Sequence, residues 1–302
     1  MNPFKFSDDN KRYHTLAYHN KHTYGGRVYK ATLDAHFSCP NNGGCIYCKD
    51  TFDPRPIEEQ WSAECARIRA KDENAKICAY FGVHTNTFCT PEMLSELLGT
   101  ARKLGAFSVS LATRTDCLDE QKARILAGFP LPLTVELGLQ TVHDSTAKFI
   151  NRGHTFSDFL RGYALLKEHN IRVCVHIING LPRETPEMMI ETAKVLAKLR
   201  PNGVKIHSLH VLRGTRLCEL YESGEYTPLT REEYIDTTSR QLELLPPETV
   251  IERVTGDGDK SLLAAPLWSA DKISVLGGLD KRLADMNTYQ GKLFGENSNA
   301  GS

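Results

Sequence analysis

The chain has 302 residues, of which 40% are hydrophobic and 25% charged, a composition typical of a globular protein long enough for one large α/β barrel or two ordinary domains. Its 37 Lys and Arg residues balance its 37 Asp and Glu residues, which argues against a surface that binds nucleic acid over its whole extent. No apolar run is long enough to span a bilayer, and the N-terminus lacks the apolar segment of a secretory signal, so we expect a cytoplasmic protein without membrane contact.

Residues 1–26 are expected to form a basic N-terminal arm. Residues 1–36 carry six Lys and Arg residues against three Asp residues, with four histidines and four tyrosines between them. Aromatic rings stack on bases and cations pair with phosphates, so this mixture is compatible with RNA contact. A solvated arm is the favoured interpretation, because charge runs are common and rarely diagnostic.

From residue 27 to 212, apolar β-branched segments alternate with helical patterns. Strands are predicted at 28–35, 76–82, 106–112, 133–139, 171–178 and 203–209, and helices at 57–69, 91–104, 118–127, 145–150, 156–169 and 186–199. Thr90 is expected to cap the second helix, which has Pro91 at its first position. Buried strands joined by crossover helices form parallel sheets, and six such repeats favour an α/β partial (β/α)6 TIM-like barrel over a closed eight-stranded one.

The remainder of the chain has a different pattern. Residues 213–292 are expected to form a C-terminal α+β extension that covers the barrel, with a helix at 231–245, a strand at 249–254, a Gly/Asp turn at 255–259 and helices around 269–286. Residues 293–302 are expected to be a disordered tail.

The strongest chemical signal is Cys39-Pro-Asn-Asn-Gly-Gly-Cys45-Ile-Tyr-Cys48, three thiols in a glycine-containing loop after the first strand. Thiolates are the preferred ligands of iron–sulfur clusters, and three ligands on a four-iron cluster leave one iron open, as chelation of S-adenosylmethionine (SAM) requires. Zinc is the competing interpretation, with His36 or Cys65 as a fourth ligand, and three buried thiols are the structural alternative. Ligands of parallel α/β folds gather at the carboxyl ends of the strands, which favours the cluster.

Several segments together resemble the YhcC/YtqA family of radical SAM proteins, related to the Elongator catalytic subunit and to the oxygen-independent coproporphyrinogen oxidase. They are Phe37–Asn41, Tyr80-Phe81 with Thr85-Asn86-Thr87, Ala112–Leu118, Glu136–Thr141, Asn151–His154, His176–Pro182 and Thr255-Gly256-Asp257-Gly258. The resemblance implies the radical SAM barrel, a 4Fe–4S cluster on Cys39, Cys45 and Cys48, and SAM as cofactor.

Two departures from the family pattern bear on the site. Five residues separate Cys39 from Cys45, fewer than is usual in the family, and Gly82-Val83-His84 stand where other residues are expected. The Gly-Gly-Glu that many radical SAM enzymes have after the second strand is absent, and Thr85, Asn86 and Thr87 occupy its place as expected cofactor contacts.

Alternation along the fourth strand places Glu136 and Gln140 on the inner face of the barrel, where they can bind the ribose or amine of SAM. The alternative is that Glu136 pairs with a buried Arg or Lys. By resemblance Arg152 binds the SAM carboxylate, with a surface salt bridge as the alternative. His176 is a SAM or substrate contact, or a core histidine. Ile178 and the backbone of Tyr47 and Leu209 are expected to line the adenine.

Arg114, Asp116 and Cys117 follow the third strand and are expected to handle substrate, with Cys117 as a hydrogen-atom donor. The alternative is that Asp116 caps a helix and Cys117 is buried, and this alternative is favoured for Cys117 but not for Arg114.

The resemblance implies reductive cleavage of SAM to a 5′-deoxyadenosyl radical, for modification of a transfer RNA wobble uridine at its carbon-5 side chain. Transfer RNA and a flavodoxin- or ferredoxin-type electron donor are then the expected partners. A radical SAM enzyme for a small metabolite and a zinc-binding RNA or protein adaptor without enzymatic activity remain alternatives.

Overall fold

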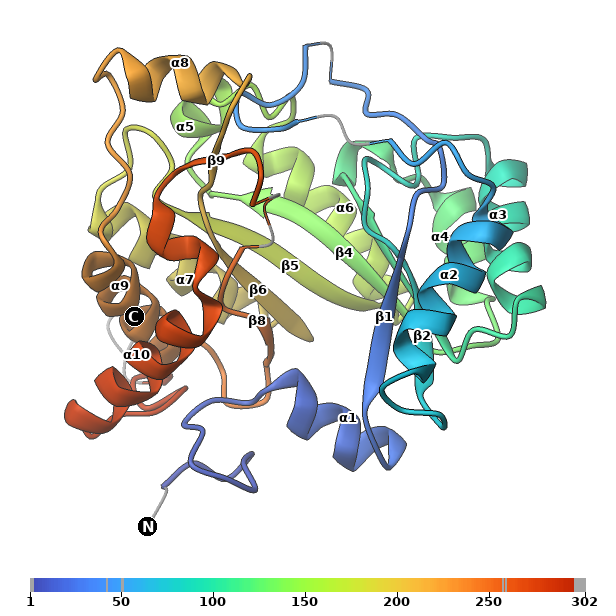
Figure 1. Ribbon diagram of the computed structural model, residues 1–302, viewed down its shortest axis with the longest axis horizontal. Coiled ribbons are helices and arrows are strands. Elements are labelled where there is room, and N and C mark those ends of the chain that lie inside the picture. The colour runs from blue at the N-terminus through green and yellow to red at the C-terminus, as the bar shows by residue number, and fades with distance from the viewer. Residues whose placement is uncertain (1–2, 42, 50–51, 257, 259, 296–302) are drawn as a thin grey trace.

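The strands of the chain form a curled parallel sheet that is open on one side (Figure 1). The computed structural model describes residues 3–41, 43–49, 52–256, 258 and 260–295, and within them seven strands pair in the order β1-β2-β3-β4-β5-β6-β8. The strands are β1 Val28–Leu33, β2 Lys76–Phe81, β3 Ser108–Thr113, β4 Leu133–Gln140, β5 Arg172–Asn179, β6 Gly203–Ser208 and β8 Val250–Arg253. All six pairings are parallel, so the carboxyl ends of the strands lie at one rim.

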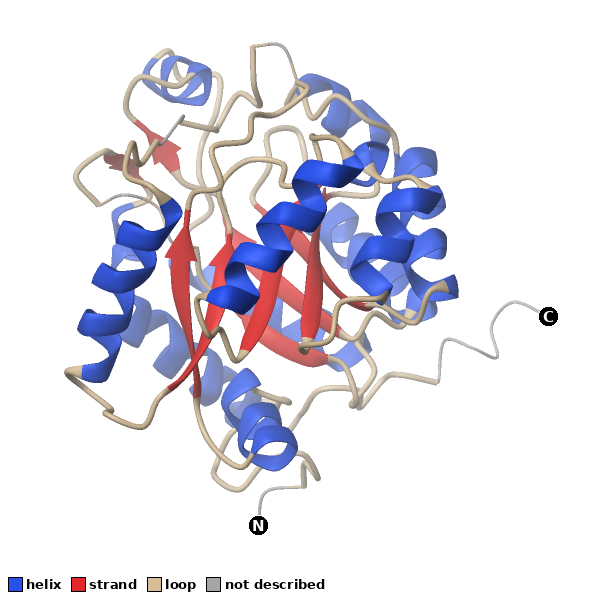
Figure 2. Cartoon of the chain, turned by 90° about the vertical axis from the view of Figure 1, so that its right-hand side faces the viewer, coloured by secondary structure: helices blue, strands red, loops and turns tan. Residues whose placement is uncertain are grey.

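Helices cover the convex face of this half-barrel, as Figure 2 shows from the β1 side. They are α2 Ile57–Arg69, α3 Pro91–Lys103, α4 Glu120–Ala127, α5 Asp144–Phe149, α6 Phe156–Glu168 and α7 Pro186–Leu199. Thr90 caps α3, as the sequence predicts, and Thr185 caps α7 in the same way. Each hydroxyl accepts a hydrogen bond from a backbone N–H, and a proline occupies the first turn of each helix.

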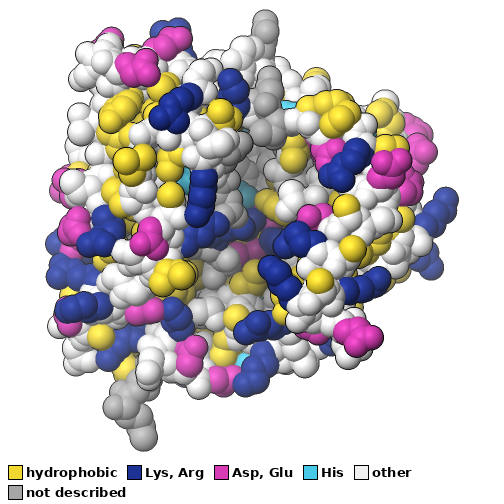
Figure 3. Space-filling model, viewed as in Figure 1, with side chains coloured by type: hydrophobic (Ala, Val, Ile, Leu, Met, Phe, Trp, Pro, Cys, Tyr) yellow, Lys and Arg dark blue, Asp and Glu magenta, His cyan; other side chains and the backbone are white. Residues whose placement is uncertain are grey.

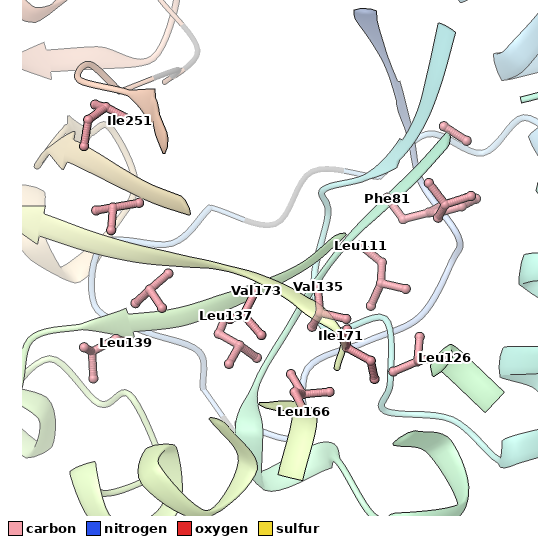
Figure 4. Close-up of a cluster of buried hydrophobic side chains, with 14 of the residues drawn as sticks. Phe81, Leu111, Leu126, Val135, Leu137, Leu139, Leu166, Ile171, Val173 and Ile251 are labelled. Atoms are coloured by element: carbon pink, nitrogen blue, oxygen red, sulfur yellow. The ribbon is translucent and has the colours of Figure 1, made fainter. Parts of the chain in front are cut away.

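The two faces of each strand differ in polarity, which decides where the core lies. Outward-facing residues such as Leu111, Val135, Leu137 and Val173 are fully or almost fully buried in the main hydrophobic core, between the sheet and the helices (Figure 4). The alternate residues face the inside of the half-barrel and are largely polar, as Glu136 is. The concave face is therefore available for a site.

The partial barrel predicted from the sequence is confirmed in its six βα units, and the sheet continues beyond them. Strand β8 pairs with β6 in parallel, so residues that the sequence analysis assigned to the C-terminal extension complete the barrel sheet. The rest of the extension contains β7 Val211–Leu212 paired with β9 Leu263–Ala265, helices α8 Arg216–Glu222, α9 Arg231–Leu244 and α10 Lys272–Asp285, and a 3-10 turn at Leu267–Ala270.

The N-terminal segment is folded, unlike the solvated arm that the sequence favoured. Helix α1, Leu16–Tyr24, packs against β8 and β1, and Thr15 forms an isolated bridge with Ile251. Phe4, Tyr13 and His14 are buried. Figure 1 shows α1 below the sheet, at the amino ends of β1 and β8, far from the loops at the opposite rim.

The end of the predicted tail is also bound to the body. The backbone N–H of Leu293 donates to the carbonyl of Glu243, and Arg200 lies over the ring of Phe294. Residues 296–302 of that predicted tail, and Asp257 and Asp259 of the predicted turn, lie outside the described residues. Among the helices described, none has the length and apolarity that a membrane span needs.

Candidate active site

The loop that carries the three cysteines lies at the carboxyl rim, between β1 and α2. The backbone N–H of Ile46 donates to the carbonyl of Ile150 at 3.1 Å, and the carbonyl of Ile46 accepts from Leu217 at 2.8 Å. Asn151 donates its side-chain amide to the carbonyl of Gly44 at 2.6 Å. Gly44 has a φ of 67°, in the left-handed region that favours glycine. The loop is thus fixed to the α5–α6 connection and to α8.

The thiols of the loop have different neighbours. The pKa of Cys45 is lowered to about 7, first because Cys48 hydrogen-bonds to it and further because Tyr47 and Asn41 do so, which outweighs its burial. The sulfur of Cys39 lies 3.2 Å from the hydroxyl of Thr85. Among the described residues, no three His, Cys, Asp or Glu side chains converge as a preassembled group for a single metal ion.

The additional ligands considered for zinc have other contacts. His36 places its Nε2 2.8 Å from the carbonyl oxygen of Asp53, on the side of α2. Cys65 is buried in α2 among core residues. Both candidates for a fourth zinc ligand therefore have contacts elsewhere, which favours a cluster on the three loop thiols over a four-ligand zinc site.

Iron–sulfur chemistry fits the residues around the thiols better. The sulfurs have polar donors beside them, with the amide of Asn41 3.7 Å from the sulfur of Cys45 and the hydroxyl of Thr85 beside Cys39. The guanidinium of Arg114 also lowers the pKa of Cys45, less than the hydrogen bonds from Cys48 and Tyr47 do but more than the one from Asn41. Hydrogen bonds to sulfur and nearby charge are the usual means by which proteins stabilise and tune such clusters.

Arg152 is buried, and the salt bridge considered from the sequence joins it to the exposed Asp144. Its side chain is 2% exposed, and it donates from Nε to the carbonyl of His154 at 3.0 Å and from Nη1 to the carbonyls of Thr141, at 2.7 Å, and Leu139. Its Nη2 is buried without a hydrogen-bond partner, and the nearest carboxylate oxygen, on Asp144, is 3.6 Å away. A buried donor that makes no hydrogen bond is costly, so Nη2 marks a position for a further acceptor beside Asp144.

Arg114 and Asp116 form a bidentate pair, with Nε–Oδ1 at 2.9 Å and Nη2–Oδ2 at 2.6 Å. The helix cap considered for Asp116 is supplied instead by Asp119, which accepts from the backbone N–H of Lys122. Cys117 is buried, and burial raises the pKa of its thiol to about 11, with Asp116 contributing. The thiol therefore stays protonated at neutral pH.

Gly153 explains why Arg114 lies so close to the cysteine loop. Gly153 has a φ of +84°, and a Cβ there would lie 3.1 Å from the Arg114 guanidinium and 3.1 Å from the side-chain oxygen of Asn41. The absence of a side chain lets the guanidinium and the loop meet over the backbone of Gly153.

Glu136 faces the half-barrel interior, and both of its oxygens are already bonded. Oε1 accepts from Lys30 at 2.6 Å and from Ser110 at 2.6 Å, and Oε2 contacts His176 at 2.8 Å and Lys205. Burial raises the pKa of Glu136, but the two ammonium groups and His176 outweigh it and hold the pKa well below its usual range. This is the pairing with buried lysine that the sequence left open, and it engages His176 as well.

The predicted contacts Thr85, Asn86 and Thr87 hold strand ends together. Asn86 donates to the backbone carbonyls of Phe81, Val83 and Ala112, while its side-chain oxygen is buried without a partner. The hydroxyl of Thr87 is buried and lies 2.5 Å from that of Thr113. Thr85, beside Cys39, is the member of the three that reaches the cysteine loop.

An apolar cluster adjoins the cysteine loop. Leu209 is buried in it with Ile46 and Ile150, and Tyr47 and Ile178 pack against it. Tyr47, Ile178 and Leu209, the three positions expected to line an adenine, thus belong to one cluster. Gln140, at the end of β4, has a φ of 60° and folds its amide back over Gly138, where a Cβ would lie 2.6 Å from its Nε2.

Sequence reasoning missed several residues that the fold brings to the interior or the loop. They are Lys30, Asn41, Tyr80, Asn151, His154, Lys205 and His207. Lys205 and His207 could have been found from the segment Gly-Val-Lys-Ile-His-Ser. They take alternate positions of this apolar strand, so both side chains point to the same face. A buried lysine in such a strand needs a partner, and only the fold identifies it.

Comparisons with known proteins agree with this architecture. Residues 37–196 match the radical SAM superfamily model, and residues 201–285 match the radical SAM C-terminal domain model. The YtqA protein of Bacillus subtilis is 42% identical over 97% of this chain and 96% of its own length, and YhcC of Escherichia coli K12 is 30% identical over 90% and 92%.

More distant matches share part of the chain or the fold alone. The tRNA uridine(34) acetyltransferase of Methanocaldococcus jannaschii is 33% identical over 126 residues, which are 41% of this chain and 23% of that protein. The structure of an N-terminally truncated Elp3 from Methanocaldococcus infernus superposes with a TM-score of 0.67 at 19% identity, over 87% of this chain and 64% of that one. With its cysteine loop at the carboxyl rim of a parallel half-barrel, the chain belongs to the radical SAM superfamily, in the group of YtqA and YhcC, and is a radical SAM enzyme.

Proposed function

We propose that this radical SAM enzyme modifies the carbon-5 side chain of the wobble uridine in transfer RNA. The observation that carries the proposal is the match to the tRNA uridine(34) acetyltransferase, whose name specifies that nucleoside. The open side of the half-barrel supports it, because a base on a large RNA can enter from that side. Figure 3 shows Lys, Arg and His side chains in and around this hollow. Helix α1 lies at the opposite end of the strands and gives no support to RNA binding at the site.

Cys39, Cys45 and Cys48 are the residues that would hold a 4Fe–4S cluster, since they are thiolate donors on one loop with polar partners. Arg152 would bind the SAM carboxylate with its Nη2, which makes no hydrogen bond, and the cluster of Tyr47, Ile178 and Leu209 would take the adenine. The reduced cluster and SAM, when bound, supply a 5′-deoxyadenosyl radical. The protein's own contribution is to orient the cofactor and to exclude water.

The pair of Arg114 and Asp116 is proposed to contact substrate, because Arg114 lies beside the cysteine loop and Asp116 lies beside the thiol of Cys117. Cys117 is the proposed hydrogen-atom source. Its protonated thiol would donate the S–H hydrogen atom to a carbon-centred substrate radical, and the resulting sulfur radical would take up one electron from the donor protein and one proton.

A flavodoxin- or ferredoxin-type protein is the proposed electron donor, acting in the cytoplasm. Residues Cys39 and Cys48 are exposed, so a cluster bound there has an edge at the protein surface. The nine cysteines are all free thiols, as expected for a reducing compartment.

The test compares wobble nucleosides by mass spectrometry in cells without the gene, complemented with wild type, Cys39→Ala or the buried-thiol control Cys218→Ala. We expect wild type and the control to restore a modified wobble uridine that Cys39→Ala does not restore. Wobble uridines that are identical in all four strains would contradict the proposal. If SAM cleavage is intact in such protein, a small metabolite becomes the substrate to search for.

A further inference from the structure

The interior of the half-barrel contains a row of charges that begins and ends with a cation. Lys205 pairs with Glu136, Glu136 with Lys30 at 2.6 Å, Lys30 with Glu252 at 3.4 Å, and Glu252 with Arg172 at 3.0 Å. Within this row of described residues three cations face two carboxylates, so the row carries one excess positive charge.

This excess charge is largely shielded from water. The side chains of Glu136, Lys205 and Glu252 are 0%, 2% and 3% exposed, while those of Lys30 and Arg172 are 22% exposed. Burial of a charge without a counter-charge costs several kcal/mol. Arg172 and Lys30 are the partly solvated members, so the unsolvated end of the row is Lys205.

The surroundings of Lys205 contain further groups able to bind an anion. The Tyr80 hydroxyl lies 3.5 Å from its Nζ, and the Tyr80 ring fits there because Gly82 has no side chain to collide with it. His207 follows Lys205 on the same face of β6, two residues nearer the carboxyl rim, and stacks on His176 with ring centroids 5.3 Å apart. The Nε2 atom of His207 is buried and has no hydrogen-bond partner.

Burial holds the pKa of His207 well below its usual value, so the ring is neutral. In the tautomer that carries its hydrogen on Nε2, the neutral imidazole donates one hydrogen bond from that nitrogen, which has no partner in the structure. A lysine ammonium and an unpaired donor two positions apart on one strand form the kind of pair that binds an oxyanion.

We propose that Lys205 and the Nε2 of His207 bind an oxyanion, a carboxylate or phosphate group of the substrate, inside the half-barrel. The bound group extends the row to an alternation of three cations and three anions. It also fixes the substrate below the rim that holds the cysteine loop. The assignment of this anion to the substrate rests on the proposed radical SAM function, whereas the anion site itself does not.

The experiment is a titration of the cluster-loaded protein, labelled with 15N-histidine, with acetate or methyl phosphate against sodium chloride at equal ionic strength. We expect a saturable shift of the His207 Nε2 signal. Lys205→Met should raise the dissociation constant at least about tenfold, since removal of one partner of a buried charged pair costs that much or more. Lys205→Arg, which keeps the charge, and Lys71→Met at an exposed site should each retain the shift.

The arms separate the possible sources. A tighter response to acetate assigns a carboxylate, and a tighter response to methyl phosphate assigns a phosphate. No saturable shift with either anion in wild type overturns the proposal whether or not Lys205→Met folds, and so does an equal affinity in Lys205→Met. A shift that saturating SAM abolishes assigns the site to the cofactor and overturns the substrate assignment. The titration needs no turnover, so unchanged wobble uridines beside intact anion binding refute the tRNA function and not the site.

Discussion

Replacing Glu136 by Gln tests whether the interior charges hold the half-barrel together. Glu136 is completely buried and accepts from Lys30, Lys205 and Ser110 while contacting His176. Glutamine has the same shape, but it has one acceptor oxygen and an NH2 group that points donors at an ammonium. The substitution therefore removes the counter-charge between the buried Lys205 and the partly exposed Lys30 without creating a cavity.

We expect Glu136→Gln to lower the free energy of unfolding by about 3–5 kcal/mol, the usual cost of breaking a buried ion pair by removing one partner. Adding Lys205→Met removes the ammonium that has lost its partner. Because the two residues are in contact, the double variant should lose about 2 kcal/mol less than the sum of the single losses.

The measurement is anaerobic urea unfolding of the cluster-free protein at neutral pH, followed by far-UV circular dichroism. Glu219→Gln on the exposed side of α8 is the matched control and should change stability by less than about 0.5 kcal/mol. If the loss of unfolding free energy in the double variant equals the sum of the two single losses within about 0.5 kcal/mol, the ion pair between Glu136 and Lys205 is refuted. A Glu136→Gln protein with unchanged stability and weakened SAM binding would instead restore Glu136 as a cofactor ligand.

Three further predictions concern the rim. Replacement of any one of Cys39, Cys45 or Cys48 by Ala should abolish iron binding and SAM cleavage, whereas Cys218→Ala should retain both; iron content comparable to wild type in the loop variants would exclude these ligands. Gly153→Ala, at a φ of +84°, should lower the free energy of unfolding by about 1–2 kcal/mol in urea titrations, whereas Gly99→Ala, with open space around it in α3, should raise it by up to about 1 kcal/mol; a Gly153→Ala protein as stable as wild type would contradict the strain argument. Burial, with help from Arg152, lowers the pKa of His154 to about 4, so the unfolded chain binds a proton below pH 6.5 that the folded protein excludes. Stability should therefore fall as pH falls through this window, and His154→Phe should reduce the loss between pH 7 and pH 5 by about 2 kcal/mol in urea titrations; equal losses in both proteins would refute this assignment.

Most helices and strands of this chain could be predicted from its sequence. The alternation of Val135, Leu137 and Leu139 with polar neighbours predicted which face of β4 packs on helices, because successive strand residues point to opposite sides. Helix α7 begins and ends at the predicted residues, since the Thr185 cap and the following proline define its start. The cysteine loop could also be found from the sequence, because its three thiols lie close together along the chain.

The partners of the interior residues depended on tertiary structure. Lys30 and Lys205 are 106 and 69 residues from Glu136 in the chain, and no local pattern predicts that they meet. The same holds for β8. Its short apolar segment could pair with any sheet edge, and only the fold shows that its partner is β6.

The burial of Arg152 was likewise a property of the fold, because three backbone carbonyls from the end of β4 and the following loops had to converge on its guanidinium. The sequence by itself determined the elements, the cysteine loop and the superfamily, which depend on residues close together in the chain. The tertiary structure decided which charges compensate one another inside the half-barrel, because electrostatic pairing depends on distance in space and not along the chain.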